Sequence, residues 1–230
     1  MRSIVIIIGP DGSGKSTLEN ALVELASNTY YKAISATTRP MREGEKEGVQ
    51  YFYKQQEGEN RGLPTFDPTE MLENVVYAGN NYGLPLDQIH STKDTIVVAE
   101  TGGAIQIKNF VEEHSLPVKI HYVFLNIPLK VRKQNLTKEI DRKYNELISK
   151  ANKAPDPAHA EKKVAKLERE LETALEDMNT RLERGTIDID FKKAMESELE
   201  KESILTIGKL SKNLPLSVHE WLTLTKRMYN

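Results

Sequence analysis

The fold of this chain is decided by the stretch Gly9-Pro10-Asp11-Gly12-Ser13-Gly14-Lys15-Ser16-Thr17. The run before it, residues 4–8, is apolar and β-branched, as in a strand buried on both faces. After it, apolar residues at helical spacing predict a helix with one apolar stripe, made by Leu18, Ala21, Leu22 and Leu25. A strand, a glycine-rich turn and a helix form the context in which G-x-x-x-x-G-K-[ST] predicts a phosphate-binding loop.

The chemistry of this stretch suits a nucleoside triphosphate. Glycines allow backbone N–H groups to turn inward around a polyphosphate, and the start of the helix adds unpaired donors and its positive dipole end. Lys15 is expected to reach the β- and γ-phosphates, and the Ser16 hydroxyl to take a place on Mg²⁺. The residues expected to contact the nucleotide are Gly9, Asp11, Gly12, Ser13, Gly14, Lys15, Ser16 and Thr17.

Composition argues against several classes of protein. With 32 basic residues against 34 acidic ones, the 230-residue chain has no overall field that would attract nucleic acid or an anionic membrane. Cysteine is absent, which excludes disulfides and thiolate metal sites, and the five histidines lack metal-ligand spacing. No apolar stretch approaches the length of a membrane span. We therefore expect a soluble, cytoplasmic protein without a nucleic-acid or membrane partner.

The rest of the chain alternates strands and helices over much of its length. Residues 95–99 and 119–125 predict buried strands, with a helix between them from about residue 104 to 114. Residues 204–207 predict a last strand and residues 216–228 a closing helix. This alternation predicts an α/β fold with a parallel sheet flanked by helices and with ligands at the carboxyl ends of the strands.

Two segments depart from the alternation. Residues 32–92 are polar and rich in Gly, Pro, Tyr and Arg, which is typical of a binding surface on a rigid scaffold. In residues 130–200, two apolar stripes at helical spacing flank Ala154-Pro155-Asp156-Pro157, where the prolines interrupt any helix. Here we expect two antiparallel helices that face each other, with their many Glu and Lys side chains in solvent.

Three motifs in order resemble those of guanylate kinases, within the P-loop nucleoside monophosphate kinases: GPDGSGKST, SATTRPMREGEKEGVQYFY and LENVVYAGNNYGLP. The similarity covers roughly residues 1–130. It implies a P-loop kinase core made of residues 1–31, 93–130 and 183–230, and a segment for the nucleoside monophosphate (NMP) at residues 32–92. Residues 131–182 would then form a lid region that carries an inserted helical hairpin.

The resemblance assigns the acceptor site residue by residue. Arg39 and Arg42 match two arginines that clamp the acceptor phosphate, and Tyr51 and Tyr82 match tyrosines that complete this site. Arginine suits the task because its planar fork forms two parallel hydrogen bonds with phosphate oxygens. Two further residues match positions that read the guanine base, Ser35 and Glu73.

The chain departs from the family pattern at three places. Leu84 stands where a Ser or Thr usually contacts the base, and Val98-Ala99-Glu100 replaces an Asp-x-Asp, so that Glu100 stands in for the second aspartate. Arg181 is the residue expected to act as the lid arginine, ahead of Arg132 and Arg142. The inserted hairpin suits either an enlarged lid or a surface for a homodimer.

The resemblance implies transfer of the γ-phosphoryl group of ATP, with Mg²⁺, to a GMP-like or dGMP-like monophosphate. Lys15, Arg39, Arg42 and Arg181 would be the catalytic residues, and the acceptor would contact Ser35, Arg39, Arg42, Tyr51, Glu73, Tyr82, Leu84 and Glu100. One alternative is a related P-loop kinase that acts on another or a modified nucleotide, or on a sugar phosphate. The other is a non-catalytic guanylate-kinase-like interaction module.

Overall fold

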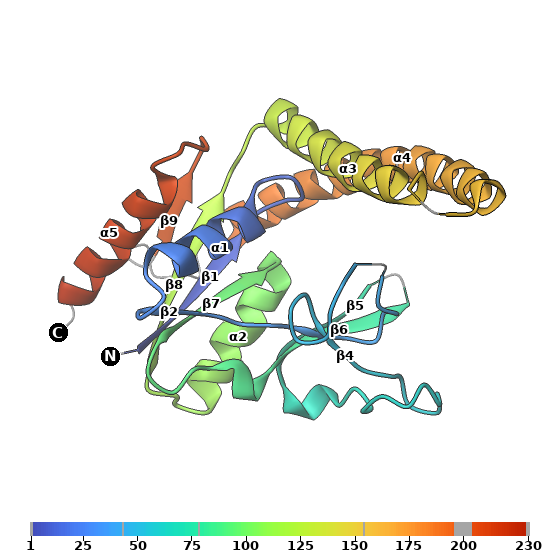
Figure 1. The fold of residues 1–230 in the computed structure, drawn as a ribbon. Helices are drawn as coiled ribbons and strands as arrows, with labels where there is room; N and C mark the ends of the chain where they lie inside the picture. The colour runs from blue at the N-terminus through green and yellow to red at the C-terminus, as the bar shows by residue number, and fades with distance from the viewer. Residues whose placement is uncertain (1, 43, 78, 154, 196–203, 229–230) are drawn as a thin grey trace.

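The computed structural model describes residues 2–42, 44–77, 79–153, 155–195 and 204–228 (Figure 1). Its strands are β1 (Arg2–Ile8), β2 (Tyr30–Lys32), β3 (Ala36–Thr37), β4 (Phe52–Tyr53), β5 (Met71–Tyr77), β6 (Asn80–Pro85), β7 (Asp94–Ala99), β8 (Val118–Leu125) and β9 (Ile204–Ile207). Its α-helices are α1 (Lys15–Leu25), α2 (Thr101–Glu113), α3 (Leu129–Ala151), α4 (Pro157–Met195) and α5 (Leu214–Met228). Two short 3-10 turns are η1 (Pro68–Glu70) and η2 (Leu86–Gln88).

The main sheet is parallel, with the strand order β2-β7-β1-β8-β9. Strand β1 lies in its centre, and its side chains from Ile4 to Ile8 are at most 3% exposed. A strand that is buried on both faces needs apolar side chains on both faces, which explains its unbroken apolar run. The predicted α/β fold with a parallel sheet flanked by helices is therefore confirmed.

Each face of the main sheet has its own apolar core. Ile4, Ile6 and Ile8 point to one face, where Ile107 and Val111 of α2 pack against them. The alternate side chains of β1 point to the other face, where they pack against α1 and α5 through Leu18, Leu22, Val218 and Leu222. Figure 1 shows the two layers of helices on either side of the sheet.

Residues 32–92, which we call the acceptor segment, contain a second sheet with the order β4-β3-β6-β5. The sequence predicts a polar binding surface here but not this sheet. The reason is that β3 and β4 are only two residues long, too short to show a period of two. Their positions depend on partners far along the chain, as in the pairing of Thr37 with Tyr82.

Helices α3 and α4 form a hairpin, with an apolar seam that includes Leu136, Ile140, Tyr144, Leu167 and Met178. The predicted break is present, because α3 ends at Ala151 and the Asp156 carboxylate accepts from the Ala158 N–H, 3.0 Å away, as α4 begins. Figure 1 shows the hairpin extending on the same side of the core as the acceptor segment. Within the described ranges, no helix combines the length and the apolarity that a bilayer crossing requires.

One polar side chain, His121 of β8, lies in the core beside α5. It is fully buried, its ring meets that of Trp221 edge to face with centroids 5.7 Å apart, and neither ring nitrogen has a hydrogen-bond partner among the described residues. Burial, together with the charges of Lys119 and Lys226, lowers the pKa of His121 to about 4, although Asp94 acts in the opposite direction. The folded protein therefore holds this imidazole neutral.

We expect His121→Leu to stabilise the protein. Removing two unsatisfied buried nitrogens is expected to raise the free energy of unfolding by about 1 kcal/mol at pH 7. The gain should be larger at pH 5, because the unfolded chain binds a proton near pH 6.5 that the folded chain accepts only near pH 4. Urea unfolding of both proteins at the two pH values measures this; a variant that is less stable than wild type would contradict it.

Candidate active site

The phosphate loop, residues 9–17, joins the carboxyl end of β1 to α1. Gly12 and Gly14 have φ angles of +76° and +92°, in the left-handed region that favours glycine. A Cβ on Gly12 would lie 2.5 Å from the Arg132 carbonyl oxygen, and one on Gly9 would lie 2.8 Å from Ser13 Oγ. These glycines are therefore required by the close approach of α3 and by the turn of the loop itself.

The loop fits a polyphosphate and its metal. The Lys15 ammonium bends back over the loop and donates to the Gly9 carbonyl oxygen, 2.5 Å away, and lies 4.0 Å from Asp11 Oδ1. Ser16 and Thr17 are exposed at the start of α1, and the first turn of this helix has no acidic residue that would repel an anion. The ammonium of Lys15 and the hydroxyls of Ser16 and Thr17 are groups that suit phosphate and Mg²⁺, and these roles stay predictions.

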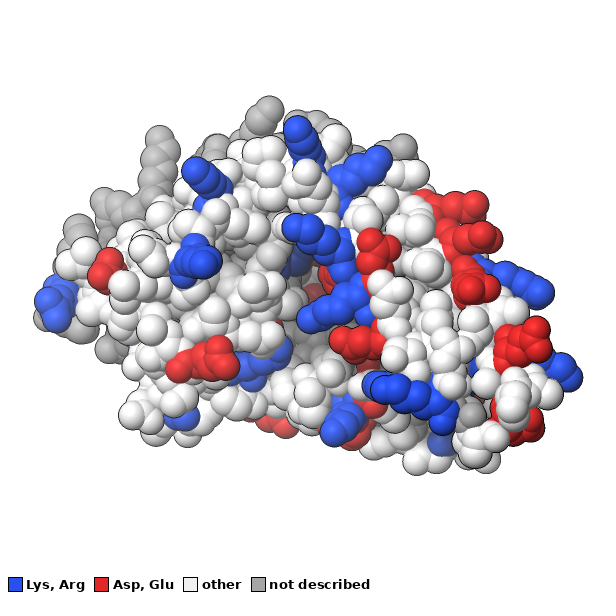
Figure 2. Space-filling model, turned by 45° about the horizontal axis from the view of Figure 1, so that its top comes forward, with Lys and Arg blue, Asp and Glu red and all other residues white. Residues whose placement is uncertain are grey.

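The acceptor segment brings Arg39, Tyr51 and Tyr82 together. The Arg39 guanidinium carbon lies 5.4 Å from the centre of the Tyr51 ring, and the Tyr51 and Tyr82 rings are 5.9 Å apart. Arg42 is exposed, and Ser35 is half-buried just before β3. Figure 2 shows a hollow near the middle of the molecule, with Lys and Arg side chains gathered along its edge.

Glu45 belongs to this cluster, and the sequence analysis did not single it out. Its carboxylate accepts from Nη1 and Nη2 of Arg39, both at 2.9 Å, from the Arg42 N–H at 2.7 Å and from the Tyr53 hydroxyl at 2.8 Å. Burial alone would raise the pKa of Glu45, but these bonds lower it to about 2. In the sequence, Glu45 is visible only as a carboxylate that follows Arg39 and Arg42 by a few residues, and this spacing alone does not predict that it binds Arg39.

A pair of carboxylates lies where β7 meets α2. Burial first, and then the nearby Glu100 carboxylate, raise the pKa of Glu73 to about 7. A Cβ on Gly103 would lie 3.1 Å from Glu73 Oε2, so the first turn of α2 reaches this side chain of β5. Because Ala99, next to Glu100, is the register partner of Ile8, which enters the phosphate loop, the pair lies at the same edge of the sheet as the loop.

The remaining predicted residues, Leu84 and the three candidate lid arginines, do not belong to these clusters, and one of them has a side chain that is not among the described ones. Leu84 is 1% exposed and belongs to the apolar core beside α2, so its contact with a base remains a proposal. The side chain of Arg181 lies outside the described residues. Arg132 is 2% exposed at the start of α3, whereas Arg142 is exposed on the same helix.

The hairpin contacts the phosphate loop, and the charge of Arg42 in the acceptor segment acts on the pKa of one hairpin residue, Tyr144. Asn135 of α3, which the sequence analysis also missed, donates from Nδ2 to the Gly12 carbonyl oxygen, 2.8 Å away. Burial and the Glu170 carboxylate raise the pKa of Tyr144, and the positive charge of Arg42 opposes that rise. One hydrogen bond therefore joins helix α3 of the hairpin directly to the phosphate loop.

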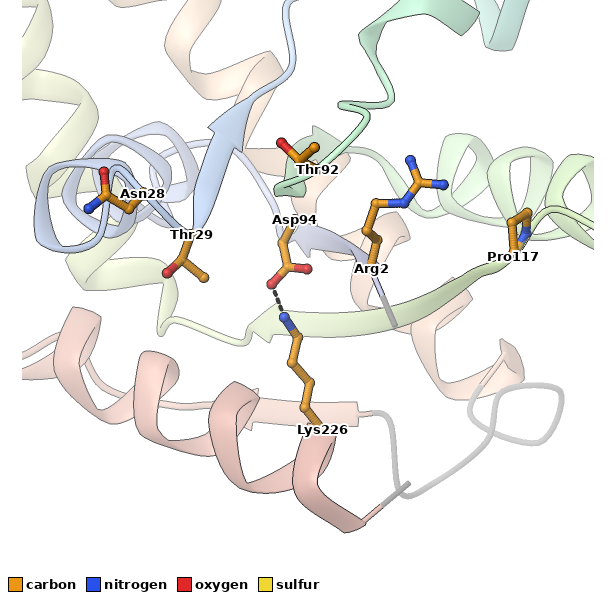
Figure 3. Close-up of a pocket in the computed structure, with 7 residues that line it drawn as sticks. All are labelled: Arg2, Asn28, Thr29, Thr92, Asp94, Pro117 and Lys226. Atoms are coloured by element: carbon orange, nitrogen blue, oxygen red, sulfur yellow. Dashed lines mark hydrogen bonds and ion pairs between the residues drawn. The ribbon is translucent and has the colours of Figure 1, made fainter. Parts of the chain in front are cut away.

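A cavity of about 610 Å³ lies at the opposite edge of the main sheet. Arg2 and Asp94 begin β1 and β7 there, and Pro117 precedes β8. Figure 3 shows Lys226 reaching from α5 to Asp94, with which it forms an ion pair. Parallel α/β sheets bind ligands at the carboxyl ends of their strands, and none of the residues that line this cavity belongs to the phosphate loop.

Fold and site together define a P-loop α/β protein with a second cluster of cationic and tyrosine side chains in the acceptor segment. The guanylate kinase family model matches residues 1–184. Because this match covers most of the chain, the chain belongs to the guanylate kinase family.

Individual relatives match over a shorter region. The chain is 36% identical over 114 residues to a guanylate kinase of Enterococcus faecalis, a match that covers 48% of this chain and 54% of the relative. It is 34% identical over 110 residues to a guanylate kinase of Bacillus subtilis, covering 46% of this chain and 52% of the relative. The chain thus spans about half the length of the curated relatives that it matches.

A solved structure of guanylate kinase from Anaplasma phagocytophilum resembles the fold. It is 19% identical, the match covers 97% of this chain and 85% of that chain, and the TM-score is 0.50. At this identity the likeness supports the fold alone.

Proposed function

We propose that the protein is an ATP-dependent nucleoside monophosphate kinase that acts on GMP or dGMP. Its products would be the nucleoside diphosphate and ADP. The observation that carries the proposal is the proximity of two differently built sites. A complete phosphate loop follows strand β1, and the Glu73–Glu100 pair lies at the end of the neighbouring strand β7. Family membership supports the same assignment.

The reaction needs alignment and charge stabilisation more than a base. A phosphate oxygen of the acceptor forms a bond to the γ-phosphorus of ATP while the bond to the β-phosphate oxygen breaks, and the electron pair leaves with ADP. Because the attacking oxygen is already an anion, no general base is required. Lys15, with the N–H groups at the start of α1, would bind the donor phosphates, and Arg39 and Arg42 the acceptor phosphate, with Arg181 proposed from the lid.

Ser16 would hold Mg²⁺ beside the loop, where the ion would offset the negative charge on the transferred group. The hairpin and the acceptor segment would exclude water, which competes as an acceptor. We also propose a cytoplasmic location, because the proposed substrates are nucleotides. A homodimer through the hairpin also remains a proposal.

Base choice is proposed to come from Glu73. Its carboxylate would accept hydrogen bonds from N1–H and the 2-amino group of guanine, a pair of donors that adenine does not present on that edge. Glu73 accepts both bonds only when ionised, so the affinity for GMP should rise between pH 6 and pH 8, around its pKa of about 7. Leu84, buried and apolar, offers no hydrogen bond to the guanine O6.

A panel of monophosphates with ATP and Mg²⁺ tests the proposal. We expect kcat/KM for GMP to exceed that for AMP by about 100-fold, because adenine would leave the half-buried Glu73 without its donors. Turnover of a modified guanine nucleotide or of a sugar phosphate in preference to GMP would favour the alternative acceptor. ATP binding by calorimetry without turnover of any acceptor would favour a non-catalytic module.

A further inference from the structure

We propose that Asn135 of α3 is a positioning residue for the phosphate loop, because it holds the Gly12 carbonyl oxygen against the helix and so keeps the loop in the shape that receives a triphosphate. This inference deepens the proposed function and rests on it, since it concerns the loop that would bind the donor nucleotide. The Asn135 side chain contacts the backbone of the loop, and it is not expected to touch the nucleotide.

Gly12 lies directly against one face of α3. A Cβ on Gly12 would lie 2.5 Å from the Arg132 carbonyl oxygen and 2.9 Å from Leu136 Cγ. Arg132, Asn135 and Leu136 are spaced i, i+3, i+4, so they share a face of the helix. The side chains of Arg132 and Leu136 are fully buried, and Asn135 between them is half-buried. This face of α3 therefore covers the loop at Gly12, and Asn135 supplies its polar group.

The peptide group between Gly12 and Ser13 is held at both of its polar atoms. Asn135 Nδ2 donates to the Gly12 carbonyl oxygen, 2.8 Å away, and the Ser13 N–H donates to the Pro10 carbonyl oxygen, 3.1 Å away. In a planar trans peptide the C=O and N–H groups point in opposite directions. The orientation of this peptide is therefore fixed by α3 on one side and by the loop itself on the other.

The same arrangement leaves the N–H groups at the start of α1 for a ligand. The turn that ends at Ser13 has Gly12 as its third residue, with a φ angle of +76° that glycine adopts readily. The first helical hydrogen bond of α1 runs from the Leu18 N–H to the Gly14 carbonyl oxygen, so the N–H groups before it have no partner within the helix. N–H groups in this position bind phosphate oxygens. Their direction depends on how the loop enters the helix just after the peptide that α3 restrains.

Two variants remove the hydrogen bond in different ways. Asn135→Leu keeps much of the volume of the side chain and removes its donor, so the Gly12 carbonyl oxygen loses its partner. Asn135→Asp keeps the shape and replaces the donor by a carboxylate, which only accepts. Asn145→Leu is the matched control, because Asn145 lies further along the same helix with its side chain exposed.

Calorimetric titration with MgATP and, separately, with inorganic tripolyphosphate measures the loop without any turnover. We expect Asn135→Leu to raise the Kd for both ligands by the same factor, about tenfold, because the loss lies in the phosphate contacts and not in those of the base. Asn135→Asp should raise both at least as much. The KM for GMP should stay within about twofold of wild type, and Asn145→Leu should change none of these constants. Melting temperatures of each variant are measured alongside.

A role confined to the packing of the hairpin would lower the melting temperature of these variants and leave the Kd for MgATP unchanged. That result in either folded variant of Asn135 would overturn the proposal, as would a rise in the KM for GMP equal to the rise for ATP. If no monophosphate is phosphorylated, the proposed function fails, and the two titrations still decide the role of Asn135. A wild-type protein that binds neither MgATP nor tripolyphosphate would overturn both.

Discussion

Lys15→Ala is expected to lower turnover by about 10²- to 10³-fold, the effect typical of removing one donor that stabilises developing charge. The ammonium of Lys15 lies over the loop, 2.5 Å from the Gly9 carbonyl oxygen, with a side chain that is 16% exposed. Triphosphate oxygens bound in the loop would meet this charge, and water cannot easily replace it there. The fold should remain, since the hydrogen bond to Gly9 is worth about 1 kcal/mol and the 4.0 Å ion pair with the exposed Asp11 carboxylate contributes less.

The measurement is ADP release at saturating ATP and GMP, together with the melting temperature. Lys108→Ala is the matched control, because Lys108 also forms a salt bridge within one turn of chain, to Glu112, but lies on α2 away from the loop. A Lys15→Ala protein that folds normally and keeps a substantial fraction of wild-type turnover would contradict the assignment of the loop.

Asp94→Ala is expected to reduce the free energy of unfolding by about 3 kcal/mol, as for loss of a buried, hydrogen-bonded charge pair. Asp94 is 4% exposed, and its Oδ1 accepts from the Ser3 N–H at 2.9 Å while Oδ2 pairs with Lys226. This one side chain joins β7 to β1 and to α5, at the edge of the main sheet opposite the phosphate loop (Figure 3). Alanine would leave the buried Ser3 N–H without its acceptor.

Urea unfolding measures this loss, and Glu112→Ala is the comparison. Glu112 has a salt bridge of 2.8 Å to Lys108, but its side chain is 60% exposed, so its loss should cost no more than about 1 kcal/mol. A double-mutant cycle with Lys226→Met then gives the coupling between the two charges. A cost for Asp94→Ala no greater than that for Glu112→Ala would show that the pair contributes little to stability.

The candidate site divides into parts that local sequence predicts and parts that it does not. The phosphate loop is predictable because its strand, glycines and helix are contiguous, and each has a local signature. The position of Arg39 among tyrosines follows only from the ordered motifs of the resemblance. The hydrogen bonds from Arg39 to Glu45 and the proximity of Glu73 to Glu100 are interactions between side chains, for which the sequence has no periodic signal.

The sequence by itself determined four of the five strands of the main sheet, all but β2, together with the helices that flank it, the phosphate loop and the break in the hairpin at Pro155 and Pro157. These features follow from residues that are neighbours in the chain, through side-chain period, glycine conformation and the missing N–H of proline. Tertiary structure alone decided the second sheet, the core position of Leu84 and the joining of Asp94 to Lys226. Their physical reason is that short strands and buried charges are stable only against partners that distant parts of the chain supply.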